Sequence, residues 1–156
     1  MVKEGGSEEG YQGNGTWVHA RDPRYAASAV ITLGCADVTR DDYPDPVAAL
    51  EGTYERRKGE PGVGLVLQFS SSGRAAAFYR RYVQQVTACR GPEAPFAAKI
   101  VRSDLGLIDQ RSLPDGDWTE VARLSGSRLT LVILTDPRHR RTRAESEALL
   151  RQIDSV

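Results

Sequence analysis

Four aspartates lie in one short segment, and residues of this type and spacing could take part in chemistry. The segment from Asp37 to Pro46 (DVTRDDYPDP) also carries Tyr43 and a single arginine. An oxygen-rich loop of this kind can hold Ca²⁺, but the central glycine and terminal glutamate of an EF-hand are missing. Carboxylates beside aromatic rings also attract a cationic, amphipathic ligand, whereas turn-forming residues can equally make a solvated loop. The candidate ligand-binding residues are Trp17, Asp41, Asp42, Tyr43 and Asp45.

A second charged segment, RHRRTR at positions 138–143, holds four arginines in six residues. The planar guanidinium fork binds phosphate groups well, so this segment is a candidate contact for phospholipid headgroups or a pyrophosphate. The alternative is a solvated, charged loop. The candidate headgroup contacts are Arg138, Arg140, Arg141 and Arg143.

Cys35 and Cys89 are the two cysteines of the chain. Only His19 and His139 could join them as zinc ligands, and no CxxC or HxxxH spacing is present, so we expect no metal site. Two cysteines in a secreted domain predict one disulfide, which would close a loop of 89 − 35 = 54 residues. The alternative is a pair of buried, reduced thiols in a cytosolic protein.

Motifs of common enzyme classes are missing from the sequence. It contains no GxSxG, no HExxH and no Walker loop, and no GxGxxG follows a predicted strand. Gly62 and Gly64 fall inside a predicted strand and indicate close packing or a bulge. We therefore expect no catalytic activity and no cofactor.

The length of 156 residues is that of one ordinary domain, and Lys plus Arg equals Asp plus Glu at 21 each. A nucleic-acid binder normally carries a basic excess, so we expect no nucleic-acid partner. Residues 1–15 are rich in glycine and nearly free of apolar side chains, which predicts a disordered stalk before a single domain at 16–156. The stalk is what remains when a signal and lipobox are removed; a frayed terminus with vector residues is the alternative.

Periodicity and turn residues predict the elements of that domain. A β-branched run predicts a strand at 28–33, a helical turn is expected at 47–50, and Thr142 with Glu145 forms a capping box that opens a C-terminal helix. The remaining expected elements are a hairpin at 51–57 and 63–69, an amphipathic helix at 73–89, strands at 98–102 and 105–110, and a hairpin at 118–124 and 128–135. This order predicts an α+β fold, with an antiparallel β-sheet, two helices packed on one face and one disulfide.

The polar stalk, Cys35 after a predicted strand, and the helical segment AFYRRYVQQVTAC (77–89) resemble small actinobacterial surface lipoproteins. An excess of 18 Arg over 3 Lys, with Asn14 as the single asparagine, fits the GC-rich genomes of that group. The chain resembles lantibiotic self-resistance (immunity) lipoproteins of the MlbQ type and, more weakly, PknH-type extracellular sensor domains.

The first resemblance implies a non-catalytic extracytoplasmic lipoprotein, held at the outer face of the cell membrane by an N-terminal lipid anchor. It would confer lantibiotic self-resistance by binding the antimicrobial peptide or by shielding its lipid-linked cell-wall target. The second resemblance implies a sensor domain for a small metabolite or lipid. In either case we expect a monomer.

Overall fold

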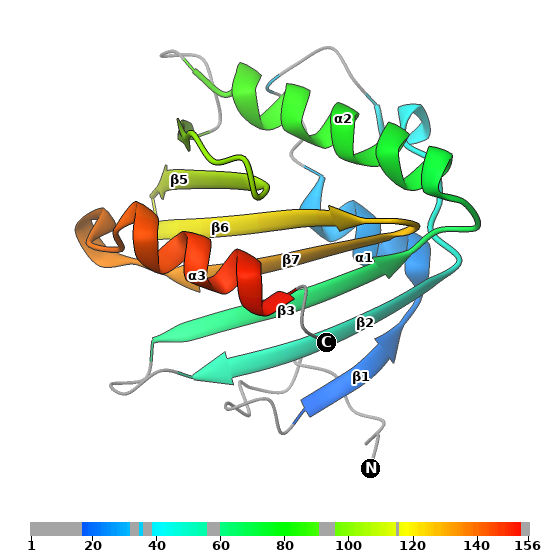
Figure 1. Ribbon diagram of the computed structural model, residues 1–156, viewed down its shortest axis with the longest axis horizontal. Coiled ribbons are helices and arrows are strands. Elements are labelled where there is room, and N and C mark those ends of the chain that lie inside the picture. The colour runs from blue at the N-terminus through cyan, green and yellow to red at the C-terminus, as the bar shows by residue number, and fades with distance from the viewer. Residues whose placement is uncertain are drawn as a thin grey trace.

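The core of the fold is a seven-stranded antiparallel sheet with the strand order β1-β2-β3-β7-β6-β5-β4 (Figure 1). The computed structural model describes residues 17–31, 35, 39–55, 60–90, 96–114 and 116–153, so the expected stalk at 1–15 lies outside the described residues. The strands are β1 (Trp17–Arg21), β2 (Ala48–Glu55), β3 (Pro61–Gln68), β4 (Ala97–Val101), β5 (Leu107–Leu113), β6 (Gly116–Ser125) and β7 (Arg128–Thr135).

Helices pack on both faces of this sheet. They are α1 (Pro23–Val30), α2 (Ser72–Ala88) and α3 (Arg143–Ile153), with short 3₁₀ turns η2 (Arg40–Asp42) and η3 (Pro137–His139). Buried residues of α1 and α2 share one hydrophobic cluster, and α3 belongs to a second cluster on the other face. In Figure 1, α3 crosses in front of β6 and β7. The predicted α+β class with an antiparallel sheet and one disulfide is confirmed. The two helices predicted from the sequence, α2 and α3, lie on opposite faces, and α1 is the helix that shares the face of α2.

Helix α1 corrects the predicted strand at 28–33 over residues 28–30, and residues 32–33 lie outside the described residues. The Asp22 carboxylate accepts a hydrogen bond of 2.8 Å from the Tyr25 amide, and Pro23 follows at the first helical position. Both features favour a helix start, and the fully buried Ala26 and Ala27 hold it against the sheet. The β-branched run therefore begins inside a helix that starts upstream, at Pro23. The predicted turn at 47–50 is also wrong, because β2 begins at Ala48.

Both predicted hairpins are present as β2–β3 and β6–β7, and β3 pairs with β7 at the centre of the sheet. Alternation along β7 sends Leu129 and Leu131 into the α1–α2 cluster, and Val132 to the α3 side. The central strand is therefore covered on both faces.

Helix α2 begins where the serine run predicts, with the Ser71 hydroxyl accepting from the Arg74 amide at 3.2 Å. Its buried face contains Phe78, Tyr82 and Val86, and also the polar Gln85. Cys89 follows the helix and forms the expected disulfide with Cys35.

Helix α3 opens with the predicted capping box. The Glu145 carboxylate accepts from the Thr142 amide at 2.7 Å, and the Glu145 amide donates to the Thr142 hydroxyl. Leu150 is fully buried against Ile108 and Val121. Within the described residues no helix is long and apolar enough to cross a bilayer.

Candidate functional site

The described helices leave half of one sheet face uncovered, and the candidate functional site lies there. Helix α3 packs beside β6 and reaches Val132 on β7, but the same face of β1, β2 and β3 carries side chains that remain open to solvent. Val18, Leu50 and Tyr54 are 44%, 47% and 41% exposed. Apolar side chains so exposed on adjacent strands form a contiguous patch, which soluble monomers rarely leave bare without a binding role.

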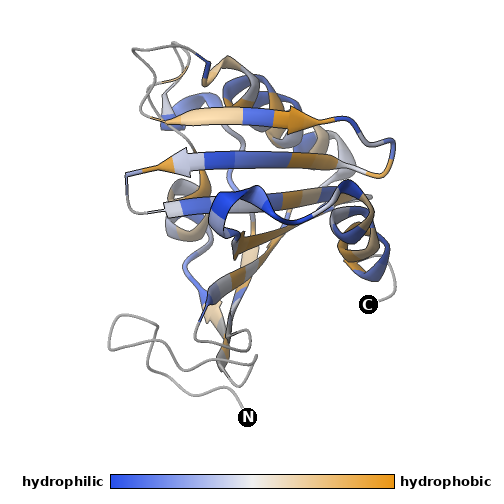
Figure 2. Cartoon of the chain, turned by 90° about the vertical axis from the view of Figure 1, so that its left-hand side faces the viewer, coloured by the Kyte–Doolittle hydropathy of each residue, from blue (hydrophilic) through white to orange (hydrophobic). Residues whose placement is uncertain are grey.

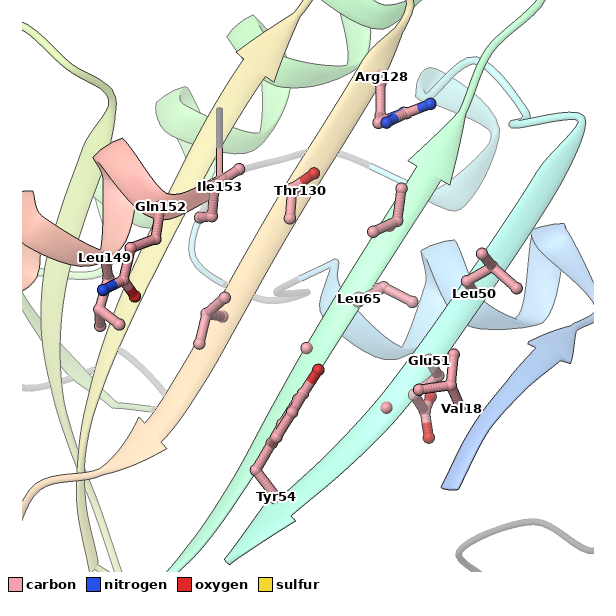
Figure 3. A pocket seen from close by; sticks show the side chains of 14 residues that line it. Val18, Leu50, Glu51, Tyr54, Leu65, Arg128, Thr130, Leu149, Gln152 and Ile153 are labelled. Atoms are coloured by element: carbon pink, nitrogen blue, oxygen red, sulfur yellow. The ribbon is translucent and has the colours of Figure 1, made fainter. Parts of the chain in front are cut away.

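These side chains form one wall of a groove with a volume of about 400 Å³, a size typical of small-ligand sites. Figure 3 shows Leu149 and Ile153 of α3 along one side and Val18 and Leu50 along the other. The apolar side chains that line it on the α3 face are Val18, Leu50, Tyr54, Val66, Val132, Leu149 and Ile153. We name this hollow the apolar groove.

Glycines make the floor of the apolar groove hollow. Gly52 on β2 pairs directly with Gly64 on β3, so two neighbouring positions carry no side chain. The ring of Tyr54 lies over both: a Cβ atom added at Gly64 would come within 3.0 Å of the Tyr54 ring, and one at Gly52 within 3.2 Å of its hydroxyl. The close-packing signal at Gly64 therefore corresponds to bare backbone under a tyrosine, whereas Gly62 packs against Leu134, since a Cβ atom added there would come within 2.6 Å of that side chain.

A polar hollow of about 280 Å³ continues from one end of the apolar groove, and the two share Arg128, Thr130 and Ile153. The other residues that line the polar hollow are Gln68, Ser125, Gly126 and Ser127. Figure 3 places Arg128 at the upper end of the groove, beyond Thr130 on the same strand. The arrangement can hold an apolar body with a polar group at one end.

Of the candidate ligand-binding residues, Tyr43 lies in the core. It is 3% exposed, and its ring packs edge-on against Phe78 at a centroid distance of 5.0 Å. Burial raises the pKa of the Tyr43 hydroxyl. The Tyr43 side chain therefore packs against α2 in the core.

The neighbouring aspartates have partners within the fold. Asp41 accepts from Arg24 at 3.0 Å, and Asp45 is paired with Arg40. The Asp42 carboxylate accepts from the Thr39 amide at 2.6 Å, and this hydrogen bond lowers the pKa of Asp42. The three carboxylates belong to the same loop, but those of Asp41 and Asp45 are already paired with arginines.

Trp17 stands apart from this loop. The loop leads into β2, whose Ala49 pairs with Arg21 at one end of β1, whereas Trp17 pairs with Thr53 at the other end. The Trp17 side chain is outside the described part of the structure. Binding by Trp17 and the aspartates stays a prediction.

The arginine segment forms η3 and the approach to α3, shown in Figure 2 as a blue, hydrophilic ribbon before the helix. Its backbone is held by carboxylates: the Arg138 amide donates to Asp117 at 3.0 Å and the Arg141 amide to Asp136 at 3.1 Å. Arg138 and Arg140 extend into solvent, while Arg143 pairs with Glu147 at 2.7 Å. The segment precedes α3, whereas the apolar groove contacts the last turns of that helix. Headgroup contact by the arginines stays a prediction.

Ser112, Asp117 and His139 form a cluster that the sequence did not indicate. The Ser112 hydroxyl lies 3.0 Å from His139 Nε2 and donates to Asp117 at 2.9 Å. In a Ser-His-Asp triad the acid binds the other ring nitrogen, Nδ1, and the serine donates to the histidine. Here Asp117 lies 3.5 Å from the same Nε2 and accepts the hydrogen bond of the Ser112 hydroxyl, so the three groups fasten η3 to the sheet.

A buried polar cluster lies beneath α2. The Tyr82 hydroxyl donates to Glu120, and Arg111 lies 3.0 Å from Glu120 and 2.6 Å from Asp109. Burial raises the pKa of Glu120 to about 8 and also raises that of Asp109. Glu120 and Asp109 are closed to solvent, so the cluster stabilises the interior and offers no surface to a ligand.

Among the described residues, no three metal-binding side chains of the His, Cys, Asp and Glu types gather in one place. The disulfide indicates the cellular compartment of the protein, because disulfides persist in oxidising compartments. It indicates an extracytoplasmic protein.

Comparison with known proteins adds little about function. No family model matches the sequence, and no curated protein matches it. Among solved structures, the chain is similar to the extracellular domain of PknH from Mycobacterium tuberculosis, at 12% identity and a TM-score of 0.48 over 92% of this chain and 78% of that one. This likeness is to the PknH type, the weaker of the two resemblances seen in the sequence. The comparisons do not show a relation to lantibiotic self-resistance lipoproteins.

Proposed function

We propose that this protein is a non-catalytic, extracytoplasmic binding protein whose apolar groove takes the apolar part of an amphipathic ligand. The observation that carries the proposal is the uncovered sheet face, where Val18, Leu50 and Tyr54 are between 41% and 47% exposed beside the last turns of α3. Its proposed role is lantibiotic self-resistance, by capture of the antimicrobial peptide or by shielding of its lipid-linked cell-wall target.

The energetics favour binding at this face. Fully burying a valine or leucine side chain is worth about 1.5–3 kcal/mol, so covering half-exposed ones contributes roughly 1 kcal/mol each. The floor of the groove is made by paired sheet strands, so binding there orders few loops and loses little conformational entropy. A lipid anchor before the domain, which we also propose, would hold the groove near the membrane where amphipathic ligands concentrate.

A titration of the isotope-labelled protein with a purified lantibiotic, followed by NMR, tests the proposal. The shifts are expected in β1, β2, β3 and the last turns of α3. Leu50→Asp should weaken binding about tenfold or more, because it places a charge in the apolar groove. Val47→Asp is the matched control, since Val47 is 60% exposed but does not line the groove. Equal loss in both variants, or shifts confined to other elements, would contradict binding at this site.

Resistance is tested separately in cells. A sensitive strain that expresses the lipid-anchored protein should tolerate several times more lantibiotic, and Leu50→Asp should abolish that gain while Val47→Asp keeps it. If the purified peptide produces no shifts but resistance persists, the protein acts on the lipid-linked target. If neither effect occurs, the self-resistance role is wrong.

A PknH-like sensor for a small metabolite or lipid is the second candidate. It is favoured by the same groove, which lies between sheet and helix and has the volume of a small-ligand site. Its signature would be tight binding of a small lipid without any gain in lantibiotic tolerance.

A further inference from the structure

The apolar groove does not end in solvent but opens into the polar hollow, with Arg128 at the junction. We infer that the two hollows form one site for an anionic lipid, whose chain lies in the groove and whose phosphate binds Arg128. This inference rests on the proposed function, and of its two forms it favours the shielding of a lipid-linked target over the capture of a cationic peptide.

Position on the strand places Arg128 in the site. Arg128, Thr130 and Val132 alternate along β7 and so point to the same side of the sheet as α3. Arg128 and Thr130 line both hollows, so the apolar and polar parts are continuous. Figure 3 shows the guanidinium at the far end of the groove from Tyr54.

Among the described residues, no acidic side chain pairs with the positive charge at this end. Arg128 is exposed and forms no ion pair with any residue that the structure describes. The other charged residue along the groove, Glu51, lies 3.7 Å from Arg21, and alternation along β2 turns its side chain toward the opposite face. A cationic peptide would meet Arg128 unfavourably, whereas an anionic group would be attracted.

Hydrogen-bond donors beside Arg128 suit a phosphate. The guanidinium fork offers paired N–H groups that match phosphate oxygens, and the hydroxyls of Ser125 and Thr130 line the same hollow. The amide nitrogen of Gln68 is already engaged by Ser127 at 2.7 Å, which keeps the rim of the hollow in place. The donors therefore converge at the point where the apolar lining ends.

Decyl phosphate and decanol have the same alkyl chain and different head groups, so comparing them separates the head group's contribution to binding from that of the chain. Calorimetry with the full chain should show that decyl phosphate binds at least tenfold more tightly than decanol, and that added salt weakens decyl phosphate alone. Arg128→Gln should lower the affinity for decyl phosphate about tenfold and leave decanol unchanged. Arg80→Gln, an exposed arginine on α2 at the opposite face, should change neither.

The outcomes keep this inference distinct from the proposed function. Equal binding of decanol and decyl phosphate, or an Arg128→Gln variant with undiminished affinity, would overturn the phosphate site and keep the apolar groove. Inorganic phosphate that binds as tightly as decyl phosphate would also overturn it, because the chain would then contribute nothing. If neither decyl compound shifts the NMR resonances of the groove residues, the apolar groove is not a binding site and the proposed function is also wrong.

Discussion

At the scale of single residues, Glu120 has the most unusual environment. It is closed to solvent, accepts a hydrogen bond from Tyr82 and lies 3.0 Å from Arg111, and burial raises its pKa from an ordinary 4.5 to about 8. The carboxyl group in the unfolded chain keeps its ordinary pKa. Between these two values the folded protein therefore binds more protons than the unfolded one, so stability is full below the unfolded pKa and is lost as pH rises through 8.

We predict that the free energy of unfolding falls as pH rises from about 5 to 8, by at most about 1.4 kcal/mol per pH unit. Glu120→Gln should flatten this profile, because the amide accepts the same hydrogen bonds without titrating. Urea unfolding at a series of pH values measures the effect, with exposed Asp104→Asn as a control that keeps the wild-type slope. A wild-type profile that rises across this range would show that Arg111 keeps Glu120 ionised.

Which single residues are functional was only partly predictable. The pairing of Cys35 with Cys89 followed from there being two cysteines, a property of the sequence itself. Tyr43 has a type common in binding loops, yet it is buried because the loop folds back under Phe78. Arg128 carries no local signal: its importance comes from the hollows on either side of it, which residues distant in sequence create.

At the scale of elements, the β2–β3 hairpin shows how a weak strand sequence can be stable. The facing Gly52 and Gly64 have no side chains to pack across the strands, and the Tyr54 ring covers both. An aromatic ring over a cross-strand glycine shields bare backbone and restores lost packing.

Tyr54→Ala should therefore lower the free energy of unfolding by about 1 kcal/mol or more, although Tyr54 is 41% exposed. Tyr25→Ala is the matched control: this tyrosine is 57% exposed and, in the described part of the chain, its ring stacks with Arg21, a contact worth about 0.5 kcal/mol. Chemical denaturation compares the two. An equal loss in both variants would mean that Tyr54 acts only as surface area.

Elements with local signals were predictable from sequence, and those without were not. The serine cap of α2 and the capping box of α3 placed both helix starts within a residue or two. Helix α1 was missed because its Asp22-Pro23 start precedes a run that favours strand by composition. The pairing of β1 with β2 joins segments some thirty residues apart, and no local pattern reports such a contact.

At the scale of the whole molecule, one covalent link joins the segments that follow α1 and α2, the two helices on the same face of the sheet. The disulfide joins Cys35, in the segment after α1, to the buried Cys89 that follows α2. Its loop spans 54 residues and encloses the β2–β3 hairpin and α2.

Reduction should lower the free energy of unfolding by about 4 kcal/mol, the chain-entropy value for a loop of this length. Urea denaturation with and without dithiothreitol measures the loss, and the double variant Cys35→Ala, Cys89→Ala should no longer respond to the reductant. A reduced protein as stable as the oxidised one would mean that the unfolded chain is already compact in this region.

The strand order has a consequence for how wide the binding site is. Strand β1 is an edge strand, hydrogen-bonded on one side to β2, and its Val18 stands on the outer wall of the groove. Edge strands separate from their neighbours at lower cost than central ones, so β1 is the wall that can swing outward without disturbing the centre of the sheet. We therefore expect a ligand thicker than the groove to displace β1 before it displaces β2 or β3, which are paired on both sides.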